Sequence, residues 1–311
     1  MYPLRSHAPS SNTFFSGIGS RRAWLQSALV APWLSACAAP SSSDGSAAWQ
    51  AALRRIEADA AGRLGVWARR SDGGPTLAWR ADERFPLCST FKVLAAAAVL
   101  DRSRRVPGLM DRVVPYGAAD LVSYSPVTAK HVGTGLSYDA LCAAALRYSD
   151  NTAGNLLLRE IGGPEGLTAY VHALGDRTFR LDRWETALND AVPGDPRDTA
   201  TPAGIGRSLQ RLLLGDALPS AERSRLVGWM RGNTTGDTRI RAGVPAGWAV
   251  ADKTGSGDYG TANDIGVVWP ASGAPWTIAV YFTQDRQPPA GTPYRSDVIA
   301  AATRAIVQAL G

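Results

Sequence analysis

Segments with the pattern of β-strands stand near both ends of this chain, and the long stretch between them has almost only helical patterns. Two strand-like segments, 63–69 and 76–80, flank a turn of Ser, Asp, Gly and Pro. Three more follow near the end, at 248–253, 264–269 and 276–282. We therefore expect an α+β fold, in which both chain ends build one five-stranded antiparallel sheet flanked by helices and an all-helical subdomain is inserted between the halves. The cleft between the two parts would hold the active site.

Apolar residues at helical spacing predict the other elements. We expect helices from just before Ser89 to Leu100 and at 49–61, 138–147, 152–160, 164–174, 202–214, 220–230 and 296–310. The segment 181–201 has no convincing period, and a structureless loop of that length in a compact domain is usually functional. We place the α/β part at 49–87 and from about 231 to 311, and the helical subdomain at about 88–230.

Residues 1–37 have the pattern of an export signal. The pair Arg21-Arg22 fits a twin-arginine signal, and the apolar stretch after it is too short to span a bilayer. Leu34–Cys37 is similar to a lipoprotein processing box that would lipidate Cys37, and the same place satisfies the small-x-small rule of ordinary signal cleavage. We expect a periplasmic protein with a flexible tether at 38–48. The alternative is an unprocessed cytoplasmic N-terminus with a chance arginine pair.

The composition excludes several classes of protein. The chain has 311 residues, of which 45% are hydrophobic and 19% charged, as is ordinary for a globular protein. Its formal net charge is +6, but the arginines of the expected leader supply half of it, and the remainder is too dispersed to indicate nucleic-acid binding. The three cysteines form no C-x-x-C pair and the three histidines are scattered, so we expect no metal site. We also expect a monomer without a cofactor.

Ser89 and Lys92 open the uninterrupted apolar run Phe91–Leu100. Their spacing puts the hydroxyl and the amine on one helix face, a turn apart. A serine hydroxyl is a good nucleophile only when a base takes its proton, and a lysine buried among apolar residues can lose enough pKa to help do so. Free N–H groups at the helix N-terminus would favour a developing oxyanion. Alternatively, Ser89 only caps the helix and Lys92 extends its amine to solvent.

Two further polar motifs stand where a ligand could reach them. Ser149-Asp150-Asn151 separates two helical patterns, so its hydroxyl and carboxamide could contact a substrate, or the triplet could simply cap the second helix. Lys253-Thr254-Gly255 ends a strand, where a lysine and hydroxyls can hold a carboxylate; the alternative is a lysine that protects an exposed sheet edge. The chain has only three lysines, and two of them lie in these motifs, which indicates sites that need a titratable amine.

The three motifs, in this order on a helix start, a helix–helix loop and a strand, resemble the set found in serine beta-lactamases and penicillin-binding proteins. The likeness runs from about Trp49 to the C-terminus. Inside the long loop, Glu185–Asn189 (ETALN) resembles the E-x-x-L-N motif of class A beta-lactamases. The chain is most similar to the chromosomal class A enzymes of Gram-negative bacteria. The resemblance implies hydrolysis of penicillins and cephalosporins, and hence antibiotic resistance.

The resemblance also implies how the reaction proceeds. Ser89 would attack the lactam carbonyl, with Lys92 or, through a water, Glu185 as the base. Glu185 would then activate the water that releases the acyl group, and Asn189 would help to hold that water. Arg183 and Asp198, which bracket the loop, would pair to close it. The resemblance further implies that Ser149, assisted by Lys253, passes a proton to the lactam nitrogen. The N–H groups of Ser89 and Ser256 would form the oxyanion hole. The residues in contact with the substrate would be Tyr124, Asn151, Thr254 and Ser256.

Some positions depart from the common pattern of the class. Ala262 stands where many members have a carboxylate-binding arginine, so we expect Arg239, which matches the position used by others, to supply this charge. Thr186 stands where a proline in a cis peptide often follows the glutamate, and a cis bond here would have to be held by the packing of the loop.

The cysteines match neither familiar bridge of the class. Cys142 corresponds to one half of a common disulfide, but Ala96 stands at its partner position. Cys88 corresponds to one half of the bridge of carbapenem-hydrolysing members, but its partner position is Gly257. We therefore expect no disulfide, and the resemblance gives no prediction of carbapenem hydrolysis.

Two other functions share the first three motifs. A D-alanyl-D-alanine peptidase, a penicillin-binding protein that stays acylated, would lack the loop glutamate, so Glu185 argues against it. A non-catalytic penicillin sensor domain would need a transmembrane anchor and a signalling partner. Steady turnover of a chromogenic cephalosporin would indicate a lactamase, and a single stoichiometric burst would indicate either alternative.

Overall fold

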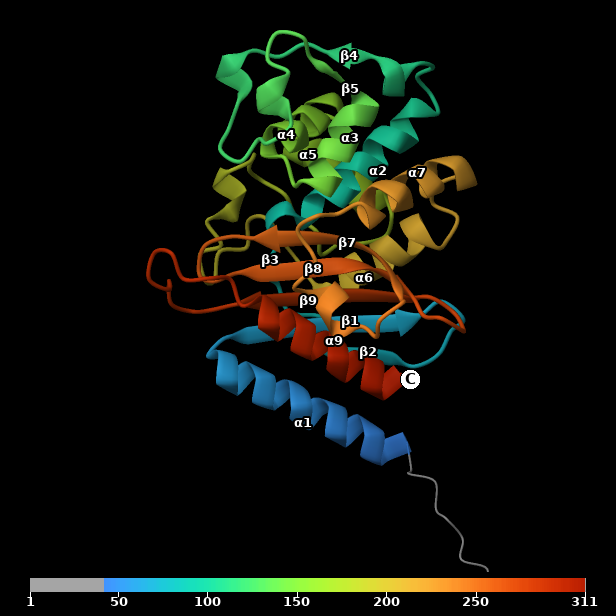
Figure 1. Cartoon of the computed structure of the whole chain (residues 1–311), viewed down its shortest axis with the longest axis vertical. Helices are drawn as coiled ribbons and strands as arrows, with labels where there is room; N and C mark the ends of the chain where they lie inside the picture. The colour runs from blue at the N-terminus through green and yellow to red at the C-terminus, as the bar shows by residue number, and fades with distance from the viewer. Residues whose placement is uncertain (1–41, 311) are drawn as a thin grey trace, which may run out of the picture. The chain divides into compact units, whose positions relative to one another are not determined.

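The fold is built on a five-stranded antiparallel sheet, as the sequence predicts (Figure 1). Its strands are β1 (Arg63–Arg70), β2 (Thr76–Trp79), β7 (Ala249–Ser256), β8 (Ala262–Trp269) and β9 (Trp276–Thr283). The strand order is β2-β1-β9-β8-β7, so the first strands of the chain lie beside the last ones. β1 pairs with β9 along its whole length, with Val66 opposite Val280. This pairing joins the two ends of the chain.

The computed structural model describes residues 42–310, and the expected leader with Cys37 lies outside them. The first helix, α1, spans Ser42–Ala60 rather than starting at Trp49. The prediction of a flexible tether at 38–48 is therefore wrong for residues 42–48, which are helical. Ala47 and Ala48 have high helix propensity, and the serine- and glycine-rich composition around them concealed this in the sequence.

Helices cover both faces of the sheet. α1 and α9 (Ser296–Leu310) pack against each other on one face, and α6 (Pro202–Leu213) lies on the other (Figure 1). β9 is consequently buried along its whole length. Its successive residues point to opposite faces, so that Val280 packs with α1 and α9 while Tyr281 belongs to the core on the α6 side. Burial on both faces explains why β9 contains a continuous apolar run, 278–282.

α2 (Phe91–Ser103) is the centre of the helical part. Its residues Phe91–Leu100 are all buried, and the small side chains of 95–98 let neighbouring helices approach closely. A short 3-10 turn, Cys88–Thr90, leads into the helix. The surrounding helices are α3 (Tyr138–Arg147), α4 (Asn151–Glu160), α5 (Gly163–Ala173) and α7 (Ser220–Arg231), and a short helix α8 (Ile240–Gly243) packs on α9.

A few boundaries differ from the prediction. The strand expected to end at Lys253 continues to Ser256, because Ser256 still pairs with Ala262 on β8. The segment 181–201 is not wholly structureless, since it holds a 3-10 turn at Ala187–Asn189. The described part of the chain also has four strands of two residues each, which are too short to produce a sequence pattern. β3 (Phe85–Pro86) pairs with β6 (Thr199–Ala200), and β4 (Val113–Val114) pairs with β5 (Leu136–Ser137).

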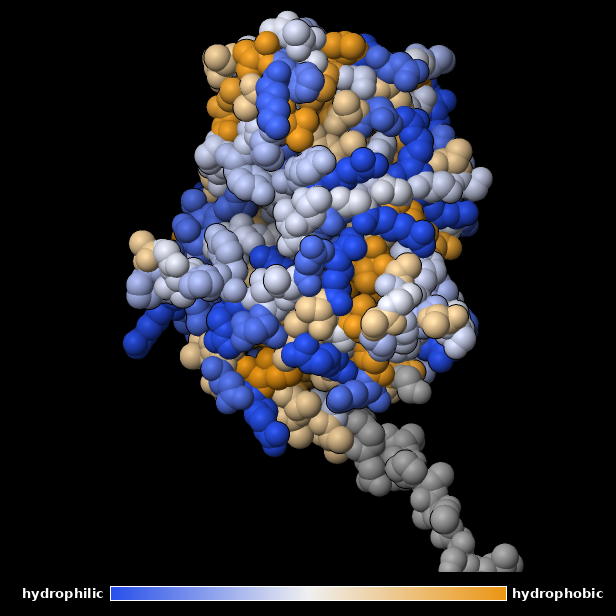
Figure 2. Space-filling view, in the orientation of Figure 1, coloured by the Kyte–Doolittle hydropathy of each residue, from blue (hydrophilic) through white to orange (hydrophobic). Residues whose placement is uncertain are grey.

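The face of the described part seen in Figure 2 mixes hydrophilic and apolar residues. Apolar residues lie at the end that carries β4 and β5 and also in the lower half of the view. Val113 of β4 is 55% exposed. Within residues 42–310, no helix has the length and apolar character needed to cross a membrane.

The contact between α6 and the sheet leads to a stability prediction. A Cβ atom at Gly206 on α6 would come within 2.1 Å of the Trp67 ring on β1. We expect Gly206→Ala to lower the free energy of unfolding by about 1–3 kcal/mol, the usual cost of overpacking a core, in urea denaturation. The matched control is Gly228→Ala on α7, where a Cβ would meet nothing within 4 Å. There, alanine should raise stability by up to about 1 kcal/mol through its helix propensity. Equal effects of both substitutions would contradict this packing argument.

Candidate active site

A pocket of about 370 Å³ opens between the helical part and the end of β7. Its lining residues are Ser89, Tyr124, Ser149, Asn151, Asn189, Thr235, Arg239, Thr254, Ser256 and Tyr294. All of these except Thr235 and Tyr294 are site residues that the sequence predicts. The other predicted residues, Lys92, Glu185 and Lys253, are buried behind the wall and hydrogen-bonded to residues that line it. The fold therefore brings the whole predicted set together.

Ser89 lies in the 3-10 turn that leads into α2. Its neighbour Cys88 has φ +45°, in the left-handed region that residues other than glycine rarely adopt, and strain of this kind is typical of functional sites. Ser89 Oγ donates a hydrogen bond to Glu185 Oε1 at 2.9 Å and accepts one from Lys92 Nζ at 2.9 Å. Thr90, not Ser89, is the N-cap residue of α2, so the alternative of a purely capping serine is wrong.

Lys92 is completely buried, so its amine does not extend to solvent. Its Nζ also donates to the backbone oxygen of Ser149 at 2.8 Å and to Asn151 Oδ1 at 2.6 Å, and it lies 2.9 Å from Glu185 Oε1. Burial lowers the pKa of Lys92 below its usual value, and the Glu185 carboxylate partly opposes this change. An amine with a lowered pKa beside a serine hydroxyl is suited to accept its proton.

Ser149, in the wall of the pocket, is in direct contact with Lys253 behind it. Lys253 Nζ donates to Ser149 Oγ at 2.9 Å, and the Ser149 backbone has φ +57°. Lys253 is completely buried, so it does not protect an exposed edge even though β7 is an edge strand. Burial, and next the charge of Lys92, hold the pKa of Lys253 well below its usual value. The capping alternative applies to Asp150, which accepts from the Ala153 N–H at the start of α4, whereas the Ser149 hydroxyl takes no part in the cap.

Glu185 is fixed by side chains on both of its flanks. Asn189 Nδ2 donates to Glu185 Oε2 at 2.6 Å. Asn155 on α4 holds the Glu185 backbone twice, since its Oδ1 accepts from the Glu185 N–H at 2.9 Å and its Nδ2 donates to the Glu185 carbonyl at 3.0 Å. The Glu185–Thr186 peptide is cis. This loop therefore aims a carboxylate at Ser89 with little freedom to move.

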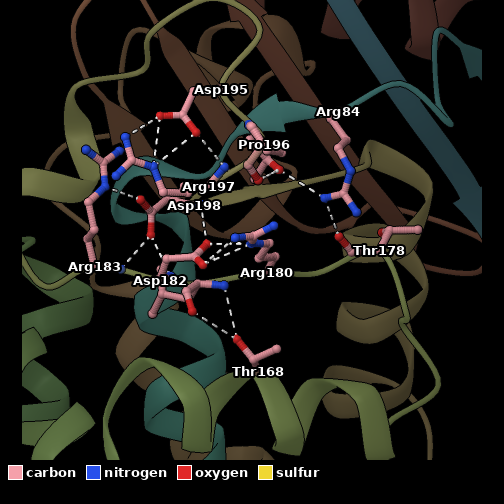
Figure 3. Close-up of polar contacts among 12 residues, drawn as sticks. Arg84, Thr168, Thr178, Arg180, Asp182, Arg183, Asp195, Pro196, Arg197 and Asp198 are labelled. Atoms are coloured by element: carbon pink, nitrogen blue, oxygen red, sulfur yellow. Dashed lines mark hydrogen bonds and ion pairs between the residues drawn. The ribbon is translucent and has the colours of Figure 1, made fainter.

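An ion pair closes the base of the same loop (Figure 3). Arg183 Nε lies 2.6 Å from Asp198 Oδ2, which confirms the predicted pairing. Asp198 is buried, and its Oδ1 accepts from the backbone N–H groups of Asp182 and Arg183 at 2.8 and 2.9 Å. Buried, charge-assisted hydrogen bonds of this kind are stronger than the exposed arginine–aspartate pairs drawn around them. The loop is thus tied at both ends by one carboxylate.

The far end of the pocket is basic and rich in hydroxyl groups. Arg239 is 5% exposed, and its guanidinium donates to Ser256 Oγ at 2.7 Å and to the backbone oxygens of Gly255 and Asn263. Burial lowers the pKa of Arg239 from its usual value. Thr254 and Ser256 on β7 line the same end. Cationic groups with hydroxyl donors form a binding place for a carboxylate.

Asn155, Thr235 and Tyr294 contribute to the site but were not predicted from the sequence. Asn155 holds the Glu185 backbone, and Thr235 shares a hydrogen bond with Thr254 at 2.5 Å. None of the three belongs to a motif that the sequence made visible. For Asn155 the only available signal was its helical spacing of four residues from Asn151 at the site end of α4.

Both cysteines in the described range are free and buried. Burial raises the pKa of each thiol above its usual value, so neither is a reactive thiolate. A Cβ placed at Gly257 would lie 2.7 Å from Cys88 Sγ, so the two positions are neighbours although no bridge joins them. Within residues 42–310, no group of three or more His, Cys, Asp and Glu side chains is arranged to hold a metal ion.

A serine hydroxyl held between a buried amine and a carboxylate, in a cleft between a sheet and a helical part, defines a serine hydrolase that works by acyl transfer. Comparisons with known proteins specify the family. A profile of the "Beta-lactamase enzyme family" matches residues 48–310. The chain belongs to this family and is a class A beta-lactamase, a hydrolase that opens beta-lactam rings.

Named relatives cover most of the chain. The "Carbapenem-hydrolyzing beta-lactamase KPC" of Klebsiella oxytoca is 52% identical over 258 residues, which cover 83% of this chain and 87% of that protein. "Beta-lactamase OXY-1" of Klebsiella oxytoca is 46% identical over 297 residues, 93% of this chain and 99% of that protein. The crystal structure of a beta-lactamase from Desulfarculus baarsii DSM 2075 matches with a TM-score of 0.83 and 54% identity, over 86% of this chain and 98% of that one.

The paired bonds of Asn155 predict a variant that loses activity more than stability. Asn155→Ala removes both contacts to the Glu185 backbone, and displacement of a reacting group by about 1 Å can cost a hundredfold in rate. We expect kcat for benzylpenicillin to fall by about that factor. Thr168→Val is the matched control, because Thr168 holds the backbone of Leu181 in the same loop by two similar bonds, at 3.0 and 3.2 Å, away from Glu185. It should destabilise by about 1–2 kcal/mol and keep kcat within about threefold. Equal losses of kcat would mean that Asn155 only stabilises the fold.

Proposed function

We propose that this chain hydrolyses penicillins and cephalosporins in two steps through an acyl-enzyme on Ser89, and thereby confers resistance to them. One observation carries the proposal. The Ser89 hydroxyl, in the wall of the pocket, is hydrogen-bonded to both Lys92 Nζ and Glu185 Oε1 at 2.9 Å. Each of these groups can take a proton from the hydroxyl, which makes the serine nucleophilic.

In the first step, Ser89 Oγ attacks the lactam carbonyl carbon. Its proton passes to the Lys92 amine, or through a water to the Glu185 carboxylate. When the C–N bond of the lactam breaks, the nitrogen takes a proton from the Ser149 hydroxyl. Lys253 Nζ, 2.9 Å from Ser149 Oγ, stabilises the alkoxide character that develops there. The base then passes the proton taken from Ser89 on to Ser149, whose Oγ lies 3.5 Å from Lys92 Nζ. The product is an ester between Ser89 and the opened lactam.

In the second step, Glu185 takes a proton from a water that attacks this ester. Asn189 donates to Glu185 Oε2, and its own Oδ1 is buried without a protein partner among residues 42–310. That free acceptor supports a role for Asn189 in holding the attacking water. When the ester C–O bond breaks, Glu185 gives this proton to Ser89 Oγ, which releases the acid and restores the Ser89 hydroxyl.

The substrate is held by its carboxylate and its amide. We assign the carboxylate to Thr254, Ser256 and Arg239, which gather at the basic end of the pocket. The N–H groups of Ser89 and Ser256 would stabilise the oxyanion. Asn151 would bind the side-chain amide, and Tyr124, which is 60% exposed, would line the mouth.

The loop that holds Glu185 favours a lactamase over a D-alanyl-D-alanine peptidase or a non-catalytic penicillin sensor. An ester in a site without a positioned base hydrolyses slowly, and the protein then stays acylated. Here a carboxylate lies within hydrogen-bonding distance of the serine that would carry the ester. The purified protein should accordingly turn over a chromogenic cephalosporin steadily, well beyond one equivalent.

Removing the base should trap the intermediate. A general base contributes about 10²–10⁴-fold, so Glu185→Gln should acylate and then deacylate that much more slowly. Intact-mass spectrometry after mixing with benzylpenicillin should show the protein plus one whole penicillin, persisting for minutes. Ser89→Ala, the control, should show no adduct. Near wild-type turnover by Glu185→Gln would mean that deacylation uses another base.

We further propose that residues 1–37 direct export by the twin-arginine route to the periplasm, with lipid attachment at Cys37. Arg21-Arg22 and the Leu34–Cys37 box support this proposal. The remaining chain, of which 49–311 is the catalytic domain, would act there as a monomer. Periplasmic hydrolysis would destroy the antibiotic before it reaches its targets in the cell wall.

Export is tested by two changes in the full-length chain. Replacing Arg21 and Arg22 by lysine should leave unprocessed precursor in the cytoplasm, because the paired guanidinium groups are the recognised feature. Cys37→Ser should move the processed protein from the membrane fraction to the soluble periplasmic fraction, since the acyl chains would be lost. Cell fractionation and immunoblotting report both. A processed Cys37→Ser protein that still partitions wholly into membranes would exclude lipidation.

A further inference from the structure

Tyr294 lines the active-site pocket although it lies outside every motif of the sequence. It belongs to the loop between β9 and α9, which projects past the end of β7 (Figure 1). The same tyrosine lines an adjoining hollow of about 660 Å³, whose other walls include Gly257, Asp258 and the proline- and glycine-rich segment 287–295. Tyr294 is therefore the wall that the catalytic pocket and the hollow share.

The backbone around Tyr294 is fixed at the basic end of the pocket. Pro293 precedes Tyr294 and restricts the chain there. The Ser296 N–H donates to the Tyr294 carbonyl at 2.7 Å, and Ser296 Oγ accepts from Arg239 Nε at 3.2 Å. At the start of the loop, the Gln284 N–H donates to the Tyr259 carbonyl at 2.8 Å. The Tyr294 side chain is 49% exposed, so part of its surface remains available to a ligand.

The proposed function places a substrate carboxylate at this end, on Thr254, Ser256 and Arg239. In a cephalosporin, the carbon next to the one bearing the carboxylate carries the C3 substituent. That substituent must therefore leave the pocket beside the carboxylate, where Tyr294 stands. A penicillin has only methyl groups in the corresponding part of its thiazolidine ring.

We propose that Tyr294 is a specificity-determining residue that stacks on flat heteroaromatic C3 substituents of cephalosporins, which extend into the hollow of Gly257, Asp258 and 287–295. This inference rests on the proposed function. Offset stacking of aromatic rings adds affinity beyond the burial of area. The proline, alanine and glycine residues of the segment 287–295 give the hollow an apolar side suited to such a ring.

The test compares two cephalosporins that share one 7-acylamino side chain and differ only at C3, one with methyl and one with a neutral heteroarylthiomethyl group. The measured quantity is the ratio of their kcat/KM values, which cancels any general loss of activity. Tyr294→Ala should lower the heteroaryl-to-methyl ratio about three- to tenfold, the range of one aromatic pair. Tyr294→Phe, which keeps the ring and removes only the hydroxyl, should preserve it.

Each outcome decides the question. An unchanged ratio in Tyr294→Ala, or an equal loss in Tyr294→Ala and Tyr294→Phe, overturns the proposal. A second pair, with one C3 group and two different acylamino chains, identifies the competing arrangement: if Tyr294→Ala changes that ratio instead, the tyrosine contacts the acylamino side. Failure of the wild-type protein to hydrolyse any of these compounds would refute the proposed function itself, whereas an active enzyme with an unchanged ratio refutes only the role of Tyr294.

Discussion

The burial of the Lys92 amine is the constraint on which the rest of the site depends. A primary amine in an otherwise apolar interior is costly unless polar groups surround it. The groups around Nζ come from separate segments: Ser89 from the turn before α2, Ser149 and Asn151 from the start of α4, and Glu185 from the long loop. Stabilising this one amine therefore requires the turn before α2, the start of α4 and the long loop all to be in place, so the stability of the helical part and the geometry of the site are not independent.

The fold also leaves space for the Lys92 side chain. A Cβ at Gly154 on α4 would come within 2.8 Å of Lys92 Cε, so α4 passes the lysine at a position without a side chain. The Ser149 hydroxyl lies 3.5 Å from Lys92 Nζ and 2.9 Å from Lys253 Nζ. Two buried amines that share one hydroxyl disfavour each other's charged form, and Lys92 contributes to the lowered pKa of Lys253. The arrangement can move a proton between groups without large conformational change.

Much of the fold could be predicted because its signals are local. The middle of β9 is an unbroken apolar run, 278–282, and α9 follows the expected limits Ser296–Leu310. The motif residues could be found because their spacing within one element already places them together, as with Ser89 and Lys92. Asn155 and Tyr294 could not be found in this way, since each acts on a segment that is distant in sequence and that only the tertiary fold brings near. The start of α1 could not be predicted, because the serine and glycine residues there indicate a flexible segment and only the alanines among them favour a helix.

The pairing of β1 with β9 has a consequence for synthesis on the ribosome. Every residue assigned to catalysis, from Ser89 to Ser256, is translated before β8 and β9 exist. Yet β7 joins the sheet only through those two strands, because the order runs β1-β9-β8-β7. A nascent chain that stopped short of β8 would carry all the side chains to which we assign catalysis and still lack the frame that holds β7 opposite the helical part. The active site is therefore completed by strands that contribute none of its catalytic groups.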